Sequence, residues 1–297
     1  MKIKDLFLNG VQRLKQAGIP EPELEVSLLF AHLLCIERTA LLLDADRALD
    51  EDQLEKFGEI IARRLNREPL AYILKEKEFW SLPFTVSEDV LIPRPETELL
   101  IEITLKTIKS QFRNPEEQRM KILDLGTGSG IIAVIFALEL PTSTVTAVDL
   151  SCNALKVAKH NARRHEVSKR IHFINCDWFG GISASAKFDL VLANPPYIAR
   201  DILEKPYGKT YESLQPDVGS YEPHLALDGG ERGIQSISRI AEDLGERLNP
   251  GGWFFMEIGA DQGEDVLGIF RKTASYDNII IHKDHAGLPR LLQARKQ

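Results

Sequence analysis

Residues 123–133 read "LDLGTGSGIIA", in which three glycines separate two apolar runs. The run before Gly126 is typical of a buried strand and the run after Gly130 of a helix, so the glycines form the turn that joins them. Glycine adopts backbone conformations closed to other residues and lets a ligand approach the main chain closely. The stretch therefore decides the local fold. By itself it only suggests a ligand, because many glycine-rich turns bind nothing.

Strand-like and helix-like segments alternate around this turn, from about residue 119 to the end of the chain. The predicted strands are "KILDL" (121–125), "TVTAVDL" (144–150), "IHFIN" (171–175), "FDLVLA" (188–193), "GWFFMEIG" (252–259), "NIIIH" (278–282) and "LLQAR" (291–295). Helices are predicted at 130–139, 151–164, 233–247 and about 262–271, and a loop at 110–118. This alternation predicts a mostly parallel sheet covered by helices on both faces, an α/β architecture.

The first 70 residues lack strand-like runs and are expected to form a small all-α bundle. Pro22 suits the first turn of a helix, and Asp50 with Gln53 resembles the capping box of another. The stretch "KEFWSLPFTV" (77–86) has two short β-prone runs around a proline-containing turn, which predicts a hairpin. We therefore predict a helical domain at 1–74, a hairpin linker at 75–95 and an α/β domain at 96–297.

The composition limits the classes of partner. The 297 residues carry 44 acidic and 37 basic side chains, so no overall positive field draws the protein onto nucleic acid. Cys35, Cys152 and Cys176 are widely spaced, which favours free thiols in a reducing compartment. His282 and His285 alone do not make a metal site, and we predict no metal. With no signal sequence or membrane-length apolar run, we expect a cytoplasmic protein without a membrane partner.

The glycine loop differs from the loops that bind dinucleotides. Its pattern is G-x-G-x-G, and it follows an acid, Asp124, which a pyrophosphate at the helix start would disfavour and a cationic amino-acid ligand would tolerate. Asp149 ends the next predicted strand, where this fold class binds ribose hydroxyls. These residues indicate S-adenosylmethionine, although Asp149 alternatively caps the helix that begins at Ser151. The predicted cofactor loop consists of Gly126, Thr127, Gly128, Ser129 and Gly130.

A third cofactor element follows the third predicted strand. The indole of Trp178 suits packing on adenine, and Asp177 suits an exocyclic amine. The alternative is that Trp178 belongs only to the core.

The tetrapeptide "NPPY" (194–197) follows the fourth predicted strand, at the sheet edge where ligands of open α/β sheets bind. Pro195 and Pro196 restrict the backbone and lack N–H groups, so their carbonyls act as acceptors in set directions. Asn194 adds a side-chain carbonyl, and Tyr197 adds a flat apolar face with a polar tip. Such a set of acceptors suits a planar NH₂ group held in line with a methyl donor. Alternatively the tetrapeptide is only a proline-rich turn.

The chain resembles the N5-glutamine methyltransferases of peptide-chain release factors, the HemK/PrmC family. The matching motifs are "REPLAYIL" (67–74), "EFWSLPF", "VLIPRPETE" (90–98), "DLGTGSG", "DLVLANPPYI" and "EPHLALDGG" (222–230). The resemblance implies a seven-stranded, Rossmann-like class I methyltransferase domain, with the amino-terminal helices docking the release factor. It also implies that Gly126 to Gly130, Asp149, Trp178 and Asn194 contact S-adenosylmethionine. The residues Asn194, Pro195, Pro196 and Tyr197 are then implied to bind the glutamine of the factor's Gly-Gly-Gln tip.

Two positions depart from the family pattern, and three other functions stay open. Lys75 stands where a glycine usually precedes the hairpin, and Arg232 where an acid is usual. The alternatives are a glutamine methyltransferase acting on a ribosomal protein, a nucleic-acid amino methyltransferase, and an inactive cofactor-binding scaffold. The order "PRPETE" favours the release factor over the ribosomal protein. We expect no direct nucleic-acid partner and a monomer.

Overall fold

The computed structural model describes residues 1–111, 117–205, 214–273 and 275–297. Most of the loop predicted at 110–118 lies outside these residues. The chain divides into two compact units, of which one comprises 1–76 with 216–221 and the other 77–215 with 222–297. None of the described helices combines the length and apolar character that crossing a bilayer requires.

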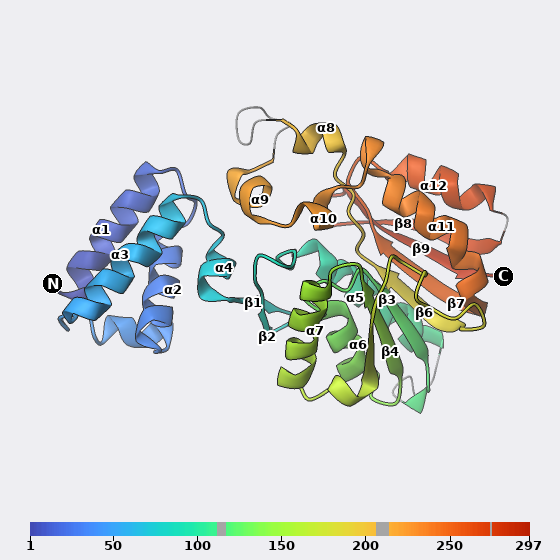
Figure 1. The fold of residues 1–297 in the computed structure, drawn as a ribbon, viewed down its shortest axis with the longest axis horizontal. Helices are drawn as coiled ribbons and strands as arrows, with labels where there is room; N and C mark the ends of the chain where they lie inside the picture. Colours follow the sequence, from blue (N-terminus) through green and yellow to red (C-terminus); the bar gives the residue numbers. More distant parts are fainter. Residues whose placement is uncertain (112–116, 206–213, 274) are drawn as a thin grey trace. The chain divides into compact units, whose positions relative to one another are not determined.

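The first unit is a helical bundle (Figure 1). Its elements are α1 (Ile3–Gln16), α2 (Pro22–Leu34), the 3-10 helix η1 (Arg38–Leu42), α3 (Glu51–Leu65), α4 (Leu70–Leu74) and α9 (Pro216–Tyr221). The capping box at the start of α3 is confirmed, since Gln53 N–H donates to Asp50 Oδ1 at 2.8 Å and the Gln53 side chain accepts from Asp50 N–H. Phe30 and Phe57 stack in the core, with ring centroids 4.2 Å apart.

A buried arginine joins α9 to the rest of the helical unit. Arg64 on α3 donates to Glu25 Oε2 at 2.6 Å and to Asp217 Oδ2 at 2.8 Å. Removing either acid would leave part of a buried charge unpaired, which is costly. This contact explains why a segment more than 150 residues away in the sequence packs with the amino-terminal helices.

The second unit is built on a seven-stranded sheet of order β5-β4-β3-β6-β7-β9-β8. The strands are β3 (Lys121–Leu125), β4 (Thr144–Asp149), β5 (Ile171–Asn175), β6 (Phe188–Ala193), β7 (Leu248–Glu257), β8 (Tyr276–Lys283) and β9 (Pro289–Lys296). Neighbouring strands from β5 to β7 pair in parallel, whereas β9 runs antiparallel to both β7 and β8. The prediction of a seven-stranded α/β domain after a helical bundle is confirmed.

Helices cover both faces of this sheet (Figure 1). One apolar core contains α5 (Glu96–Gln111), α6 (Ile131–Glu139) and part of α7 (Cys152–Arg164), and the other contains α11 (Gln235–Arg247) and α12 (Gly263–Lys272). Successive residues of a strand alternate between the cores, so Leu190 and Leu192 face one and Val191 and Ala193 the other. Because both faces are buried, these strands read as continuous apolar runs in the sequence.

The predicted hairpin is present as a separate two-stranded sheet of β1 (Glu76–Phe79) and β2 (Leu82–Thr85). Phe79 and Phe84 are buried in the same core as α5 and α6. Lys75 ends α4 with a φ of 57°, in the left-handed region that favours glycine. A lysine here therefore keeps the turn at a conformational cost that a glycine would avoid.

The strand order reverses at β3, because β4 lies on one side of it and β6 on the other. In open α/β sheets, ligands bind beyond the carboxyl ends of the strands at such a point. Several short elements between the strands were not predicted. They are η3 (Ser168–Arg170), α8 (Arg200–Leu203), α10 (His224–Leu227) and η4 (Glu231–Gly233).

Candidate active site

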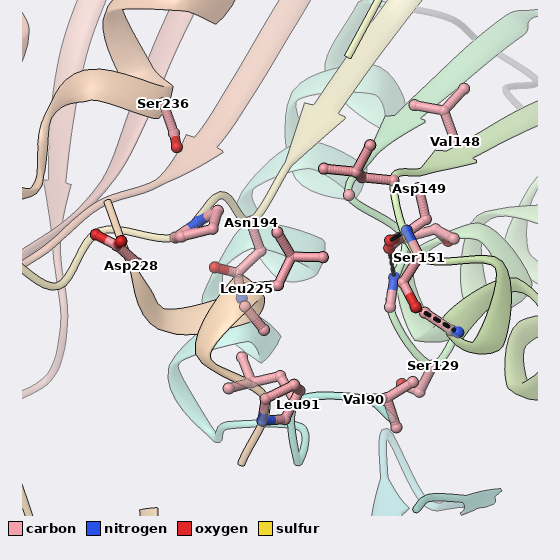
Figure 2. Close-up of a pocket in the computed structure, with 18 of the residues that line it drawn as sticks. Val90, Leu91, Ser129, Val148, Asp149, Ser151, Asn194, Leu225, Asp228 and Ser236 are labelled. Carbon is pink, nitrogen blue, oxygen red and sulfur yellow. Dashed lines mark hydrogen bonds between the residues drawn. The ribbon is translucent and has the colours of Figure 1, made fainter. Parts of the chain in front are cut away.

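A pocket of about 320 Å³ lies in the second unit at the carboxyl ends of β3, β4 and β6. Figure 2 shows Asn194 between Asp149 on one side and Asp228 on the other. Of the predicted site residues, those that line the pocket are Gly126, Thr127, Gly128, Ser129, Asp149, Asp177, Trp178, Asn194 and Pro196. The structure therefore brings most of the predicted cofactor and acceptor residues into a single wall.

The glycine loop between β3 and α6 has three left-handed glycines. The φ angles of Gly126, Gly128 and Gly130 are 70°, 54° and 82°, which other residues rarely adopt. A Cβ on Gly130 would lie 2.9 Å from the Cβ of Ala158, so this glycine permits α6 and α7 to pack closely. Gly130 is absent from the pocket wall, and we assign it to this packing rather than to direct contact with a ligand.

Asp149 lies at the end of β4 and is bound to the main chain on both sides. Its Oδ2 accepts from Gly128 N–H and its Oδ1 from Ser151 N–H, each at 2.8 Å. Burial raises the pKa of this carboxyl, and the two N–H donors oppose the shift. The N-cap of α7 is Ser151, whose hydroxyl accepts from Ala154 N–H, so the alternative of Asp149 as the helix cap is not what the structure has.

Asp124 is fully buried beneath the loop rather than in the pocket wall. The hydroxyl of Thr127 donates to its Oδ2 at 2.6 Å. Burial raises the pKa of Asp124 to about 7, although the Thr127 hydroxyl acts in the opposite direction. The acid thus supports the loop from below.

Asp177 and Trp178 follow β5, and both line the pocket. The Trp178 ring lies against Gly126, about 3.5 Å from where a Cβ of that residue would be, and its φ of 47° is unusual for a bulky residue. Asp177 accepts from Arg239 on α11 at 2.6 Å, in an ion pair that also lines the pocket. In this structure the predicted acceptor for an adenine amine is bound to an arginine that sequence reasoning missed.

The four residues of the tetrapeptide have different surroundings. Asn194 and Pro196 line the pocket, and Pro195 is buried. The Tyr197 hydroxyl donates to Glu257 Oε1 at 3.1 Å. Burial and the nearby Glu257 carboxylate raise the pKa of Tyr197 well above its ordinary value, so its hydroxyl keeps its proton.

Two further residues, which contact Asn194 and Tyr197, were not predicted as site residues. Thr97, in the first turn of α5, accepts from Asn194 Nδ2 at 3.1 Å and donates to Glu257 Oε2 at 2.7 Å. Burial raises the pKa of Glu257 to about 7, against the two hydroxyl donors. A signal for Glu257 existed in the sequence, because an acid ends an apolar strand there as Asp149 does on β4.

Arg232 departs from the family pattern on η4. Its φ is 58°, and its guanidinium forms an exposed ion pair with Asp265 on α12 at 2.7 Å. His282 was considered as a metal ligand in the sequence. In the structure its Nε2 lies 2.8 Å from Gln293 Oε1, at hydrogen-bond distance. Among the described residues no cluster of three or more His, Cys, Asp or Glu side chains has the arrangement of a metal site.

The pocket wall fits S-adenosylmethionine. Each oxygen of the Asp149 carboxylate retains acceptor capacity beyond its N–H bond, which suits a pair of ribose hydroxyls. Apolar side chains of Val90, Ile132 and Val148 line the same cavity, as a nucleoside requires. A sheet of this order with such a pocket beyond β3 and β4 defines a class I methyltransferase, which uses S-adenosylmethionine as its methyl donor.

Comparison with known proteins specifies the family. Family models match the chain at residues 5–74 (PrmC N-terminal domain) and 98–206 (Methyltransferase small domain). A release factor glutamine methyltransferase of Koribacter versatilis is 39% identical over 296 residues, covering 100% of this chain and 99% of its own. One of Nitratidesulfovibrio vulgaris is 36% identical over 295 residues, covering 99% and 95%. The chain belongs to the release factor glutamine methyltransferase family.

Solved structures support the fold of the chain. The hMettl16 catalytic domain, solved with a MAT2A 3'UTR hairpin, has a TM-score of 0.56 and 16% sequence identity, and the match covers 80% of this chain and 81% of that one. At this identity the likeness concerns the fold alone.

Proposed function

We propose that this enzyme transfers a methyl group from S-adenosylmethionine to the side-chain amide nitrogen, N5, of the glutamine in the Gly-Gly-Gln tip of peptide-chain release factors. The observation that carries the proposal is the orientation of Asn194 in the pocket wall. Its Nδ2 donates to Thr97, so its Oδ1 is the end that can accept from a substrate NH₂ group.

The bound cofactor supplies an electrophilic methyl group on its sulfonium sulfur. An amide nitrogen is a poor nucleophile because its lone pair is delocalised, so it depends on positioning. We assign one substrate N–H to Asn194 Oδ1 and the other to a proline carbonyl of the tetrapeptide. Both acceptors strengthen as positive charge develops on the nitrogen, which favours the transition state over the ground state.

The charge of the helical unit and the names of the relatives support a protein substrate over nucleic acid. The first 75 residues carry 11 basic and 13 acidic side chains, which is no basic docking surface. The relatives of matching length are named for release factors, and the family model at residues 5–74 is that of the PrmC N-terminal domain. We therefore assign release factor docking to the helical domain, predicted at 1–74.

The remaining assignments extend the same proposal. We place the domain boundaries at 74/75 and 95/96, and the cofactor contacts at Gly126 to Ser129, Asp149, Trp178 and Asn194. We place the enzyme in the cytoplasm as a monomer without a nucleic-acid partner. Cys35, Cys152 and Cys176 are free in the structure, which accords with a reducing compartment.

A labelling experiment tests the substrate. The protein is incubated with methyl-labelled S-adenosylmethionine and, in separate reactions, a release factor, a ribosomal protein, RNA and DNA. We expect label only in the release factor, on the tip glutamine by mass spectrometry, and none in a factor whose tip glutamine is replaced by alanine. Labelling of RNA, DNA or the ribosomal protein without the factor would refute the proposal, and labelling of nothing would favour the inactive scaffold.

A further inference from the structure

A chain of hydrogen bonds runs from the pocket wall into the protein interior. Asn194 Nδ2 donates to Thr97 Oγ1 at 3.1 Å, and Thr97 Oγ1 donates to Glu257 Oε2 at 2.7 Å. The other carboxylate oxygen, Oε1, accepts from the Tyr197 hydroxyl at 3.1 Å. Thr97 and Glu257 are each 1% exposed, so water does not compete for these bonds.

The number of protons in this chain determines the direction of each bond. A hydroxyl has one proton, and Thr97 donates its proton to Glu257. The remaining lone pairs of Thr97 Oγ1 only accept. The group of Asn194 that faces Thr97 must therefore be the NH₂ end of the amide.

This direction matters because the two ends of an asparagine amide have nearly the same shape and opposite hydrogen-bonding roles. If the amide turned over, its NH₂ end would face the substrate NH₂, and two donors would oppose each other. The site would keep its shape and lose an acceptor. Some feature of the protein must therefore select one orientation.

We propose that Glu257, acting through Thr97, is the positioning residue that holds the carbonyl end of the Asn194 amide toward the substrate. The inference rests on the proposed function, in which that carbonyl binds the substrate NH₂. Glu257 ends β7, Thr97 lies in α5 and Asn194 follows β6, so three separate elements meet in this chain of bonds. The same carboxylate holds Tyr197, which connects the first and last residues of the tetrapeptide.

A carboxylate suits this task better than an amide of the same size. Above a pH of about 7, Glu257 is ionised and acceptor-only, and it accepts from Thr97 and Tyr197 at the same time. A glutamine side chain at the same position would offer one acceptor and one donor. If its NH₂ group faced Thr97, the hydroxyl would have to accept from that NH₂ group and donate to Asn194, which reverses the Asn194 amide.

The first test compares variants of Thr97 in a release factor methylation assay. Thr97→Val removes the hydroxyl with little change in shape, and we expect kcat to fall about 30-fold, the effect of losing a buried hydrogen bond to a charged network. The cofactor Kd should change less than about threefold, because Thr97 orients the Asn194 amide that accepts from the substrate. Thr97→Ser keeps the hydroxyl and should restore kcat to within about threefold of the wild type. Glu257→Gln should lower kcat to an extent similar to that of Thr97→Val.

Thr104→Val is the matched control. Thr104 lies on the same helix, is fully buried, and its hydroxyl has no hydrogen-bond partner within the described part of the chain. The same chemical change there should alter kcat less than about twofold. Equal losses in Thr97→Val and Thr97→Ser, or an unchanged kcat in Thr97→Val with folding intact, would overturn the inference.

A second measurement does not depend on turnover. In protein labelled with ¹⁵N at asparagine side chains, the NH₂ signal that disappears in Asn194→Asp belongs to Asn194. We expect this NH₂ group to exchange slowly with solvent in the wild type and Thr97→Ser, and at least about tenfold faster in Thr97→Val. An unchanged exchange rate would refute the positioning role even if the release factor is methylated. Conversely, slow exchange in a protein that methylates no release factor would refute only the proposed substrate.

Discussion

The pocket has a cofactor end at the glycine loop and an acceptor end at Asn194. Each end has a buried acid that accepts from a threonine hydroxyl, but the sequence distance between acid and threonine differs greatly. At the cofactor end, the buried Asp124 accepts from Thr127, three residues away. At the acceptor end, the buried Glu257 accepts from Thr97, 160 residues away. A pair within one loop can be recognised in the sequence, whereas a pair between β7 and α5 exists only after the sheet has formed.

The two ends also present different chemical groups to a ligand. The cofactor end offers the main chain of a glycine loop, fixed by Asp149 through Gly128 N–H. The acceptor end offers the Asn194 side chain, whose direction depends on two further side chains. We therefore expect single side-chain changes at the acceptor end to affect turnover, and changes at the cofactor end to affect cofactor affinity or folding.

The largest expected effect comes from Asn194→Ala. Loss of the acceptor should lower kcat for release factor methylation about 1000-fold, the scale of removing one transition-state acceptor or donor. Cofactor binding, measured by calorimetry, should weaken by less than about tenfold. Asn278→Ala, at an exposed position on the edge strand β8, is the control and should leave kcat within about twofold. Unchanged turnover in Asn194→Ala would remove the distinction between the two ends.

The next effect tests the main-chain design of the cofactor end. Gly130→Ala places a Cβ 2.9 Å from that of Ala158 at a φ of 82°. Left-handed strain and overpacking together should lower the free energy of unfolding by about 3 kcal/mol. Urea denaturation followed by tryptophan fluorescence measures this, since all three tryptophans, Trp80, Trp178 and Trp253, lie in the second unit.

Gly268→Ala on α12 is the matched control for that substitution. A Cβ there meets nothing within 4 Å, and the residue lies inside a helix. Alanine should therefore raise the free energy of unfolding by about 0.5–1 kcal/mol. If both alanines stabilised the protein, Gly130 would not be needed for the packing of α6 on α7.

Asp149→Asn should give a smaller and purely local effect at the cofactor end. The amide keeps one acceptor but turns its NH₂ group toward Gly128 N–H or Ser151 N–H, where the carboxylate accepted from both. We expect the cofactor Kd to rise about 30-fold, or about 2 kcal/mol. Asp243→Asn, exposed on α11, is the control. A lower kcat at saturating cofactor without a change in Kd would contradict the assignment.

The sequence predicted the sheet and the glycine turn beside the pocket for a physical reason. The alternation of "KILDL", "LDLGTGSGIIA" and "TVTAVDL" expresses local preferences, and glycines at positive φ have few substitutes. The acceptor end was predicted only as far as Asn194 and its prolines. Thr97 was quoted only within the motif "VLIPRPETE" and Glu257 only within a predicted strand, so their roles at the pocket were missed.

Those two roles depend on the pairing of strands that are distant in sequence. Ala193 and Met256 are neighbours in the parallel ladder of β6 and β7, which brings the residues after them, Asn194 and Glu257, to the same edge. Pattern analysis of one chain predicts each strand but not which strands are neighbours. The contact between Arg239 and Asp177 was missed for the same reason.

The smallest expected effect is the pH dependence that Glu257 gives to the free energy of unfolding. Burial raises the pKa of Glu257 from an ordinary 4.5 to about 7 and outweighs the hydrogen bonds from Thr97 and Tyr197, which lower it. Among the nearby charges, Glu96 raises the pKa and Arg290 lowers it. A raised pKa means that the contribution of Glu257 to stability is complete below pH 4.5 and is lost as the pH rises through about 7. From pH 6 to pH 8, the free energy of unfolding of the wild type should therefore fall by about 1 kcal/mol relative to Glu257→Gln. Urea denaturation of both proteins at pH 6, 7 and 8 measures this difference, with Glu242→Gln on the exposed side of α11 as the control. A difference that stays constant with pH would mean that the pKa of Glu257 is not raised in the folded protein. The buried acids Glu257 and Asp124 would then differ in their electrostatics as well as in their sequence distance from the threonine.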